Sequence, residues 1–424
     1  MKIRVALTAW YQDRPSLIAI ANILAAGLAL LTAPIVARAI GPEGRGETAA
    51  AIAAFAIVPI FLALGVPLEI RRLAATNDES GAVRTARRLW VVALVPSIAA
   101  ALVLDYLVFD SLTLPGRMLA GLGIALAPVS MAWMTDLNVL VARANYRGVF
   151  ATRLAQPVVY LILVSCAWVL DIANVPTILA AGIMGNVFTA ILSTVLVKIS
   201  FRGPRSEYRP LLKRGASFAG STAAEAASYR LDQLLVLPLI GAQQAGYYSI
   251  ATTIGALPLA VGHALGATYF RDVAKANSRA RKALMRGAVR ASIAAAFATC
   301  LFFLATIPFA IPLVFGSAFA GAVQPAMISM TGSFFLVVSF VCSMTLAADS
   351  RGRQMTIAQT VCLAAGMLLL YLLAPPWEAS GAAIASAISY SLLLTLLLFS
   401  IRIAPSRLVP RKKDFAEAWK RILG

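Results

Sequence analysis

Ionisable side chains inside long apolar stretches are the residues of this sequence best suited to chemistry. Arg230 lies near the middle of such a stretch. A charge at the centre of a bilayer costs ~2.5–3.5 kcal/mol on insertion scales, so an arginine there has a charged partner or faces a water-filled cavity. Asp232, Glu225 and Asp136 are candidate partners, although residues two apart on a helix point about 200° apart, which makes Asp232 a poor direct one. Both interpretations are kept for Arg230.

Other polar side chains in apolar stretches suit the movement of ions. Glu225 and Asp232 are seven residues apart and share a helix face, where two carboxylates resist being ionised together. The pair is a candidate for proton exchange or cation binding, with structural pairing as the alternative. His263, the only histidine, is a candidate proton relay or a packed, hydrogen-bonded side chain. Asp136 and Asn138 are candidates to line a cavity, Asp136 for ion coupling and Asn138 for substrate contact.

The elements that carry these side chains are stretches long enough to cross a bilayer. A helix needs about 20 apolar residues to span ~30 Å of hydrocarbon. The sequence contains about twelve such stretches, at 16–40, 47–70, 89–109, 118–142, 150–170, 176–199, 216–239, 246–269, 291–316, 321–348, 355–374 and 379–402. It therefore predicts an all-α polytopic membrane protein.

Basic residues between these stretches follow a strict alternation. Of the 37 Lys and Arg, all but Arg38, Arg45, Arg117 and Arg230 lie in every second polar segment, including both ends of the chain. Loops rich in Lys and Arg stay in the cytoplasm. The pattern predicts a multi-pass protein of the bacterial inner membrane with both termini cytoplasmic.

Composition excludes several function classes. Sixty per cent of the residues are hydrophobic and 13% are charged, against about 25% charged in a soluble domain. The net charge of +19 follows the topology, so it indicates contact with anionic lipid headgroups and not nucleic-acid binding. The four cysteines are far apart and predict neither a metal site nor a disulfide. No G-x-x-x-x-G-K-[ST] phosphate-binding loop is present, so ATP is not expected to drive the protein through this motif. No cofactor is expected.

The sequence also matches itself when it is shifted by 200 residues. Ile40, Gly41 and Gly46 then fall on Ile240, Gly241 and Gly246. Six crossings separate the copies, so both halves have the same orientation and a pseudo-twofold axis along the membrane normal. We expect the following organisation: an interfacial segment 1–15, a six-helix bundle 16–200, a cytoplasmic linker 201–215, a second bundle 216–402 and a basic amphipathic tail 403–424.

Several motifs resemble those of the bacterial oligosaccharide flippases, the polysaccharide-transporter branch of the multidrug/oligosaccharidyl-lipid/polysaccharide exporter superfamily. They occur in the expected order over nearly the whole chain, at 37–47 (ARAIGPEGRGE), 229–235 (YRLDQLL), 245–251 (AGYYSIA), 313–319 (LVFGSAF) and 381–385 (GAAIA).

The resemblance implies two six-helix bundles around a central cavity and the transfer of a lipid-linked sugar from the cytoplasmic to the periplasmic leaflet. The partner implied is a polyprenyl-pyrophosphate-linked oligosaccharide, with polysaccharide polymerase machinery as a further candidate. Its pyrophosphate requires cations. Arg230 is therefore the leading candidate contact, and Arg38 and Arg45, which lie toward the periplasmic mouth, are the next candidates.

Three other functions are weighed against this one. A drug exporter of the same superfamily remains an alternative. The relative that flips the peptidoglycan precursor usually has fourteen crossings, which lowers that assignment without excluding it. A membrane-embedded polymerase or ligase is expected to need a sizeable periplasmic loop, and the outer loops here have about a dozen residues or fewer. The sequence therefore favours a transporter over an enzyme.

Overall fold

The computed structural model describes residues 16–75, 79–349, 351–401 and 408 of the 424. Every regular element within these ranges is a helix. The chain divides into two compact units, Met1–Pro238 and Leu239–Gly424, with the division inside one long helix. Apart from Leu408, the segments predicted at 1–15 and 403–424 lie outside the described residues.

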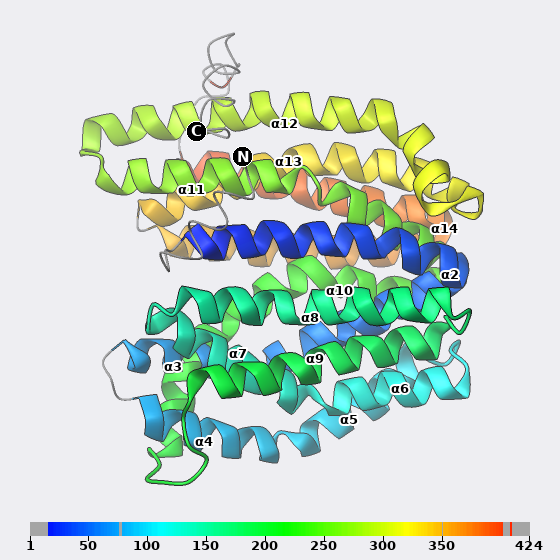
Figure 1. The fold of residues 1–424 in the computed structure, drawn as a ribbon. Coiled ribbons are helices and arrows are strands. Elements are labelled where there is room, and N and C mark those ends of the chain that lie inside the picture. The colour runs from blue at the N-terminus through cyan, green and yellow to red at the C-terminus, as the bar shows by residue number, and fades with distance from the viewer. Residues whose placement is uncertain (1–15, 76–78, 350, 402–407, 409–424) are drawn as a thin grey trace. The chain divides into compact units, whose positions relative to one another are not determined.

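The first unit consists of paired helices joined by short turns (Figure 1). Its elements are α2 (Ser16–Leu62), α3 (Val66–Ala74), α4 (Glu79–Val92), α5 (Leu94–Leu107), α6 (Leu114–Ala125), α7 (Ala127–Ala142), α8 (Tyr146–Val169), α9 (Val175–Val197) and the first part of α10 (Tyr208–Gly255). Because α10 begins at Tyr208, the second half of the predicted linker 201–215 is already helical.

The second unit begins with the remainder of α10. It continues with α11 (Leu259–Lys275), α12 (Ser278–Phe315), the 3-10 helix η1 (Ser317–Ala322), α13 (Val323–Ala348) and α14 (Gly352–Ile401). In this unit α13 packs against α11, α12 and α14.

Breaks in the long helices account for the twelve predicted crossings. Among the described residues, seven helical stretches are long and apolar enough to cross a membrane. Two bent pairs, α4 with α5 and α6 with α7, add two more. Three of the seven contain a break where the backbone is not helical, at Gly41, Gly241 and Glu378, so each supplies two crossings. The predicted all-α fold with about twelve transmembrane helices is confirmed.

The breaks at Gly41 and Gly241 have the same backbone conformation. Gly41 has φ 67° and ψ −177°, and Gly241 has φ 79° and ψ 168°. This region is open almost only to glycine, which lacks a Cβ. The helix is therefore broken by the same backbone conformation at two positions 200 residues apart, which the internal match of the sequence makes equivalent.

Arginines of the basic turns hold one end of the first unit together. The guanidinium of Arg143, which follows α7, donates to Glu79 Oε1 at 2.6 Å and to the carbonyl of Val197 at 2.7 Å. From α4, Arg84 donates to the carbonyls of Ser200 and Pro204, and Arg87 donates to the carbonyl of Ile199 at 2.8 Å. The Val197 carbonyl is one that the end of α9 leaves without a helical partner, and the other three carbonyls follow α9 in the chain. Three basic segments thus lie at the same end of the unit.

The second unit repeats this arrangement with the charges exchanged. Arg281, at the start of α12, forms an ion pair of 2.8 Å with Asp349 in the turn after α13. Arg351, in the same turn, donates to the carbonyl of Ser400 at 2.6 Å, near the end of α14. In each unit an ion pair and bonds from arginines to carbonyls at or near a helix end therefore join the basic turns.

Small residues allow close approach between helices. A Cβ at Gly255 would lie 3.2 Å from Ser333 Oγ, and one at Gly332 would lie 3.0 Å from Ala387 Cβ. Membrane helices associate through such contacts because lipid tails are as apolar as the side chains. On α12, Phe309 is 78% exposed, as expected of a side chain that faces lipid.

Candidate functional site

Arg45 and Tyr160 form the centre of the candidate site in the first unit. The break at Gly41 starts the second part of α2 and puts Arg45 in its first turns, where Thr48 Oγ1 bonds the carbonyl of Gly44 at 2.9 Å. Tyr160 lies on α8, and its phenol group is close enough to Arg45 for an electrostatic interaction. Arg45 Nε and Tyr160 OH are buried and have no hydrogen-bond partner among the described residues.

Unsatisfied buried groups of this kind are rare because each costs about 1–3 kcal/mol. Arg45 Nε is a donor, and the Tyr160 hydroxyl can donate or accept. A bound oxygen atom would satisfy Arg45 Nε directly. The pair is therefore ready to receive a ligand.

Arg230 brings a second guanidinium to this site from α10. It is exposed, and its Nη1 makes a long hydrogen bond of 3.4 Å with Gln233 Oε1. Arg45 and Arg230 are close enough to repel one another, and the carboxylate of Asp232 attracts Arg230 without an ion pair between described residues. Two guanidinium groups near a phenol match a phosphate or pyrophosphate, whose oxygens accept paired N–H bonds.

The third predicted arginine, Arg38, lies on the other side of the Gly41 break. It is exposed, near the end of the first part of α2. No described contact joins it to Arg45 or Arg230, so its role as a substrate contact stays a prediction.

Asp136 lies in a buried network beneath the basic turns. Its carboxylate accepts hydrogen bonds from Thr194 Oγ1 at 3.0 Å and Ser193 Oγ at 3.2 Å, and Arg87 Nη2 lies 3.5 Å away. Asp136 is 1% exposed. These contacts suit a carboxylate that joins α4, α7 and α9, and its proposed part in ion coupling stays a prediction.

The remaining predicted polar residues are dispersed. Asn138 donates to the carbonyl of Met134 within its own helix. His263, in the second unit, is exposed, and its ring lies 4.3 Å from that of Phe340. Asp232 Oδ1 accepts a bond from the backbone N–H of Gln233. The side chain of Glu225 lies outside the described residues, so its pairing with Asp232 stays a prediction.

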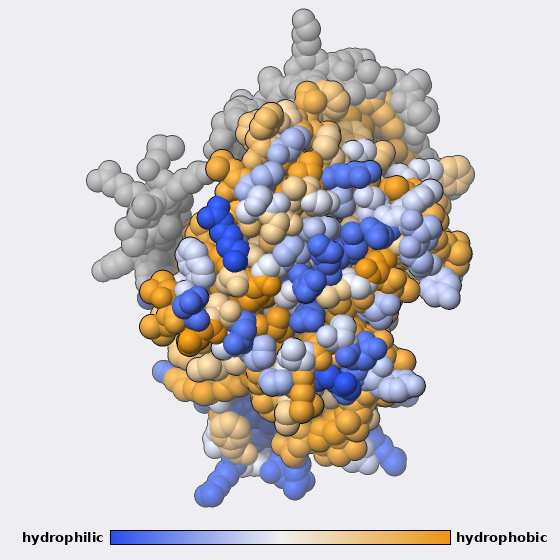
Figure 2. All heavy atoms as spheres, turned by 90° about the vertical axis from the view of Figure 1, so that its right-hand side faces the viewer, coloured by the Kyte–Doolittle hydropathy of each residue, from blue (hydrophilic) through white to orange (hydrophobic). Residues whose placement is uncertain are grey.

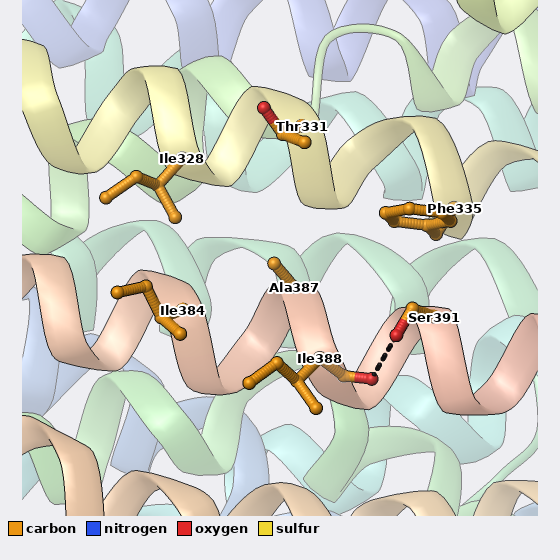
Figure 3. A pocket seen from close by; sticks show the side chains of 7 residues that line it. All are labelled: Ile328, Thr331, Phe335, Ile384, Ala387, Ile388 and Ser391. Atoms are coloured by element: carbon orange, nitrogen blue, oxygen red, sulfur yellow. Dashed lines mark hydrogen bonds between the residues drawn. The ribbon is translucent and has the colours of Figure 1, made fainter.

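An open groove in the second unit contrasts with the arginine site. Its volume is about 310 Å³, and Figure 3 shows the side chains of α13 and α14 that form it: Ile328, Thr331, Phe335, Ile384, Ala387, Ile388 and Ser391. The two hydroxyls are already used, because Thr331 bonds the carbonyl of Met327 and Ser391 that of Ile388. The groove suits hydrocarbon and offers no charge to an anion.

The surface over the ends of the helices is mixed. Figure 2 looks onto the end at which the α5–α6 and α8–α9 turns lie, and hydrophilic residues gather there among hydrophobic ones. Within the described ranges, no group of three or more His, Cys, Asp or Glu side chains is placed to hold a metal ion.

The sequence was compared with protein families. The model of the family described as "Polysaccharide biosynthesis protein" matches residues 15–270, which is more than half of the chain. The chain belongs to this family. No curated protein sequence matches it.

Solved structures share the fold at low identity. "Lipid II flippase MurJ, inward closed conformation" has a TM-score of 0.74 and 13% identity over 95% of this chain and 89% of that one. An inward-facing multidrug resistance transporter of the MATE family has a TM-score of 0.69 and 14% identity over 95% and 99%. The eukaryotic MATE transporter AtDTX14 has 0.58 and 14% over 98% and 100%. The chain is therefore a multi-pass membrane protein of the polysaccharide biosynthesis family, with the fold that these flippases and exporters share.

The sequence reasoning named Arg45 and Arg230 as substrate contacts, which stays a prediction, and did not name Tyr160. One signal was available, since a tyrosine within an apolar stretch needs a partner for its hydroxyl. Nothing in the chain order indicates that this tyrosine lies beside Arg45.

Proposed function

We propose that this protein flips a polyprenyl-pyrophosphate-linked oligosaccharide from the cytoplasmic to the periplasmic leaflet for surface polysaccharide biosynthesis. The observation that supports it best is that Arg45 interacts electrostatically with both Arg230 and Tyr160, while Arg45 Nε and the Tyr160 hydroxyl are buried without a partner among the described residues. The pyrophosphate takes the place of the missing acceptors, the prenyl chain remains in lipid, and the sugar occupies hydrated space.

A multidrug exporter is the second candidate, because MATE transporters share the fold. The charge of the site argues against cationic drugs, which two guanidinium groups repel. Deletion of the gene separates the two functions: loss of a surface polysaccharide supports the flippase, and loss of drug tolerance alone contradicts it. A growth arrest with collapse of peptidoglycan synthesis would instead indicate the peptidoglycan precursor as the substrate.

Arg230→Ala tests the site within that experiment. We expect loss of polysaccharide export at near-normal protein abundance, and partial rescue by Arg230→Lys, which keeps the charge and loses the paired N–H geometry. Arg88→Ala, which removes an exposed arginine of α4, is the matched control. Normal export by Arg230→Ala would remove this residue from the site.

The proposal includes the orientation in the inner membrane. We place both termini and the basic segment 271–290, which includes the turn between α11 and α12, in the cytoplasm and in contact with anionic lipids. Reporter fusions or single cysteines placed after residues 112, 243 and 377 should report the periplasm. For labelling, the exposed Cys166 is first replaced, since Cys300, Cys342 and Cys362 are buried. Cytoplasmic labelling at two of these three positions would contradict this orientation.

We also propose that Asp232, together with Glu225, carries the proton that drives transport. A carboxylate in a poorly hydrated site resists ionisation and releases its proton when the site opens to the other side. Asp232→Asn should impair transport in reconstituted vesicles and remove its dependence on the proton gradient. A native rate with native sensitivity to the gradient would make Asp232 structural and leave the downhill supply of substrate as the driving force.

A further inference from the structure

A second group of cationic and amide side chains lies on α8, α2 and α3. Arg153, on α8, donates from Nη1 to Asn22 Oδ1 at 2.6 Å. Its Nε is buried and has no partner among the described residues. Arg71, an exposed residue of α3, is close enough to repel Arg153. Neither arginine forms an ion pair with any carboxylate in the described ranges.

This arrangement is unfavourable unless a further group is bound. Two like charges held together and a donor without an acceptor both raise the free energy of the folded chain. Neighbouring arginines of the same unit avoid this state: Arg72 pairs with Glu69 at 2.7 Å, and Arg143 pairs with Glu79 at 2.6 Å.

The donors around Arg153 fit a phosphate group. Because the Asn22 carbonyl oxygen accepts from Arg153, the amide nitrogen of Asn22 keeps two N–H donors to offer elsewhere. Arg153 Nε and the guanidinium of Arg71 add further donors, and each carries positive charge. The group supplies N–H bonds and charge without any carboxylate oxygen, as a phosphate requires.

Helix geometry connects this group to the site at Arg45. Arg153 and Tyr160 are seven residues apart on α8, so they share a face and are separated by about 10 Å along the axis. Tyr160 interacts with Arg45. One face of α8 therefore carries Arg153 and, about two turns further along, the tyrosine of the Arg45 site.

We propose that Arg153, Arg71 and Asn22 form a second binding group for phosphate, which receives the lipid-linked pyrophosphate at the inner end of α8 before it reaches Arg45 and Arg230. This inference rests on the proposed function. The same chemistry would bind the phosphate of an anionic phospholipid, and the test separates the two sources.

The experiment measures binding of polyprenyl pyrophosphate to the full chain in nanodiscs of zwitterionic lipid. Arg153→Ala should weaken binding about tenfold, the loss expected for one charge-assisted hydrogen bond, and Arg153→Lys should recover part of it. Arg88→Ala, an exposed arginine of α4, is the matched control and should bind as the native chain does. Unchanged binding in Arg153→Ala would overturn the inference.

A second arm replaces part of the zwitterionic lipid with phosphatidylglycerol and omits the polyprenyl ligand. If Arg153→Ala reduces association of phosphatidylglycerol and leaves polyprenyl pyrophosphate binding intact, the group holds bilayer lipid and the inference is wrong. If it reduces binding of polyprenyl pyrophosphate, the inference stands.

Arg45→Ala separates this inference from the proposed function. If Arg45→Ala weakens binding and Arg153→Ala does not, only the second group is lost. If neither variant weakens binding, the proposed function fails with it. With both groups in use, the double variant should bind more weakly than either single variant.

Discussion

Arginines at the basic turns of the first unit differ in their partners from arginines among its helices. At the turns, Arg143 bonds Glu79 and the carbonyl of Val197, and Arg87 bonds the carbonyl of Ile199 with its guanidinium 4.4 Å from the ring of Phe201. Among the helices, Arg45 and Arg153 each keep a buried Nε without a partner in the described part of the chain.

The difference separates structural cations from cations held ready for a ligand. An arginine whose donors reach carboxylates and helix-end carbonyls lowers the energy of the folded chain. A desolvated guanidinium without an opposing charge raises it. The proposed function assigns an anion to such residues. On that proposal, the variants below should lose stability in the first class and transport in the second.

The largest expected effect is on transport by Arg45→Ala. Loss of one charge-assisted contact to pyrophosphate costs ~1.5–3 kcal/mol, or about 10- to 100-fold in rate. The thermal unfolding midpoint should stay level or rise, because an unpartnered buried donor is removed. Flipping assays in reconstituted vesicles and a melting curve in detergent measure the two quantities. A marked fall in the midpoint would place Arg45 in the structural class.

Arg143→Ala should have the opposite profile. The change removes the bonds to Glu79 and Val197 and should lower the free energy of unfolding by about 1–3 kcal/mol. Transport per folded molecule should remain native. Adding Glu79→Gln should restore part of the stability, since the carboxylate is then no longer left unpaired. Native stability in the single variant would show that the pair contributes nothing.

Tyr160→Phe removes a single oxygen from the ligand site. We expect transport to fall several-fold and stability to hold or improve slightly, because the hydroxyl is buried without a partner. A shift confined to the substrate concentration at half-maximal rate would indicate loss of binding. Destabilisation without any change in transport would mean that the hydroxyl has a structural partner.

The smallest effect is expected for Arg117→Gln, which tests an arginine that has a charged partner but is partly exposed. Arg117 pairs with Asp105 at 2.6 Å between α5 and α6, but both side chains are about one-third exposed. Exposed pairs contribute little. Export and unfolding midpoint should both match the native protein within error, and a loss of export would bring Arg117 into the binding class.

Several features of the fold could be predicted from residue order. Apolar length and the alternation of Lys and Arg predicted the helices and the turns that lie together, because the bilayer constrains each segment locally. The match between Gly41 and Gly241 placed both glycines at equivalent positions of the two halves, and both have the positive φ that favours glycine. Arg230 was singled out because a charge in an apolar segment is costly wherever the segment packs. Arg45 was singled out because a pyrophosphate requires cations, and both assignments stay predictions.

Packing between distant helices decided which of these residues meet. Arg45, Tyr160 and Arg230 come from three helices, and Arg153 reaches Asn22 across 131 positions of the chain. Asp136 is also an ionisable residue in an apolar stretch, the feature that singled out Arg230. Its neighbours in the structure are Arg87, Ser193 and Thr194. Whether a buried charge is satisfied depends on side chains brought within about 3 Å by tertiary contacts. Hydropathy and charge order carry no information at that distance, so they identified the costly residues and could not assign their partners.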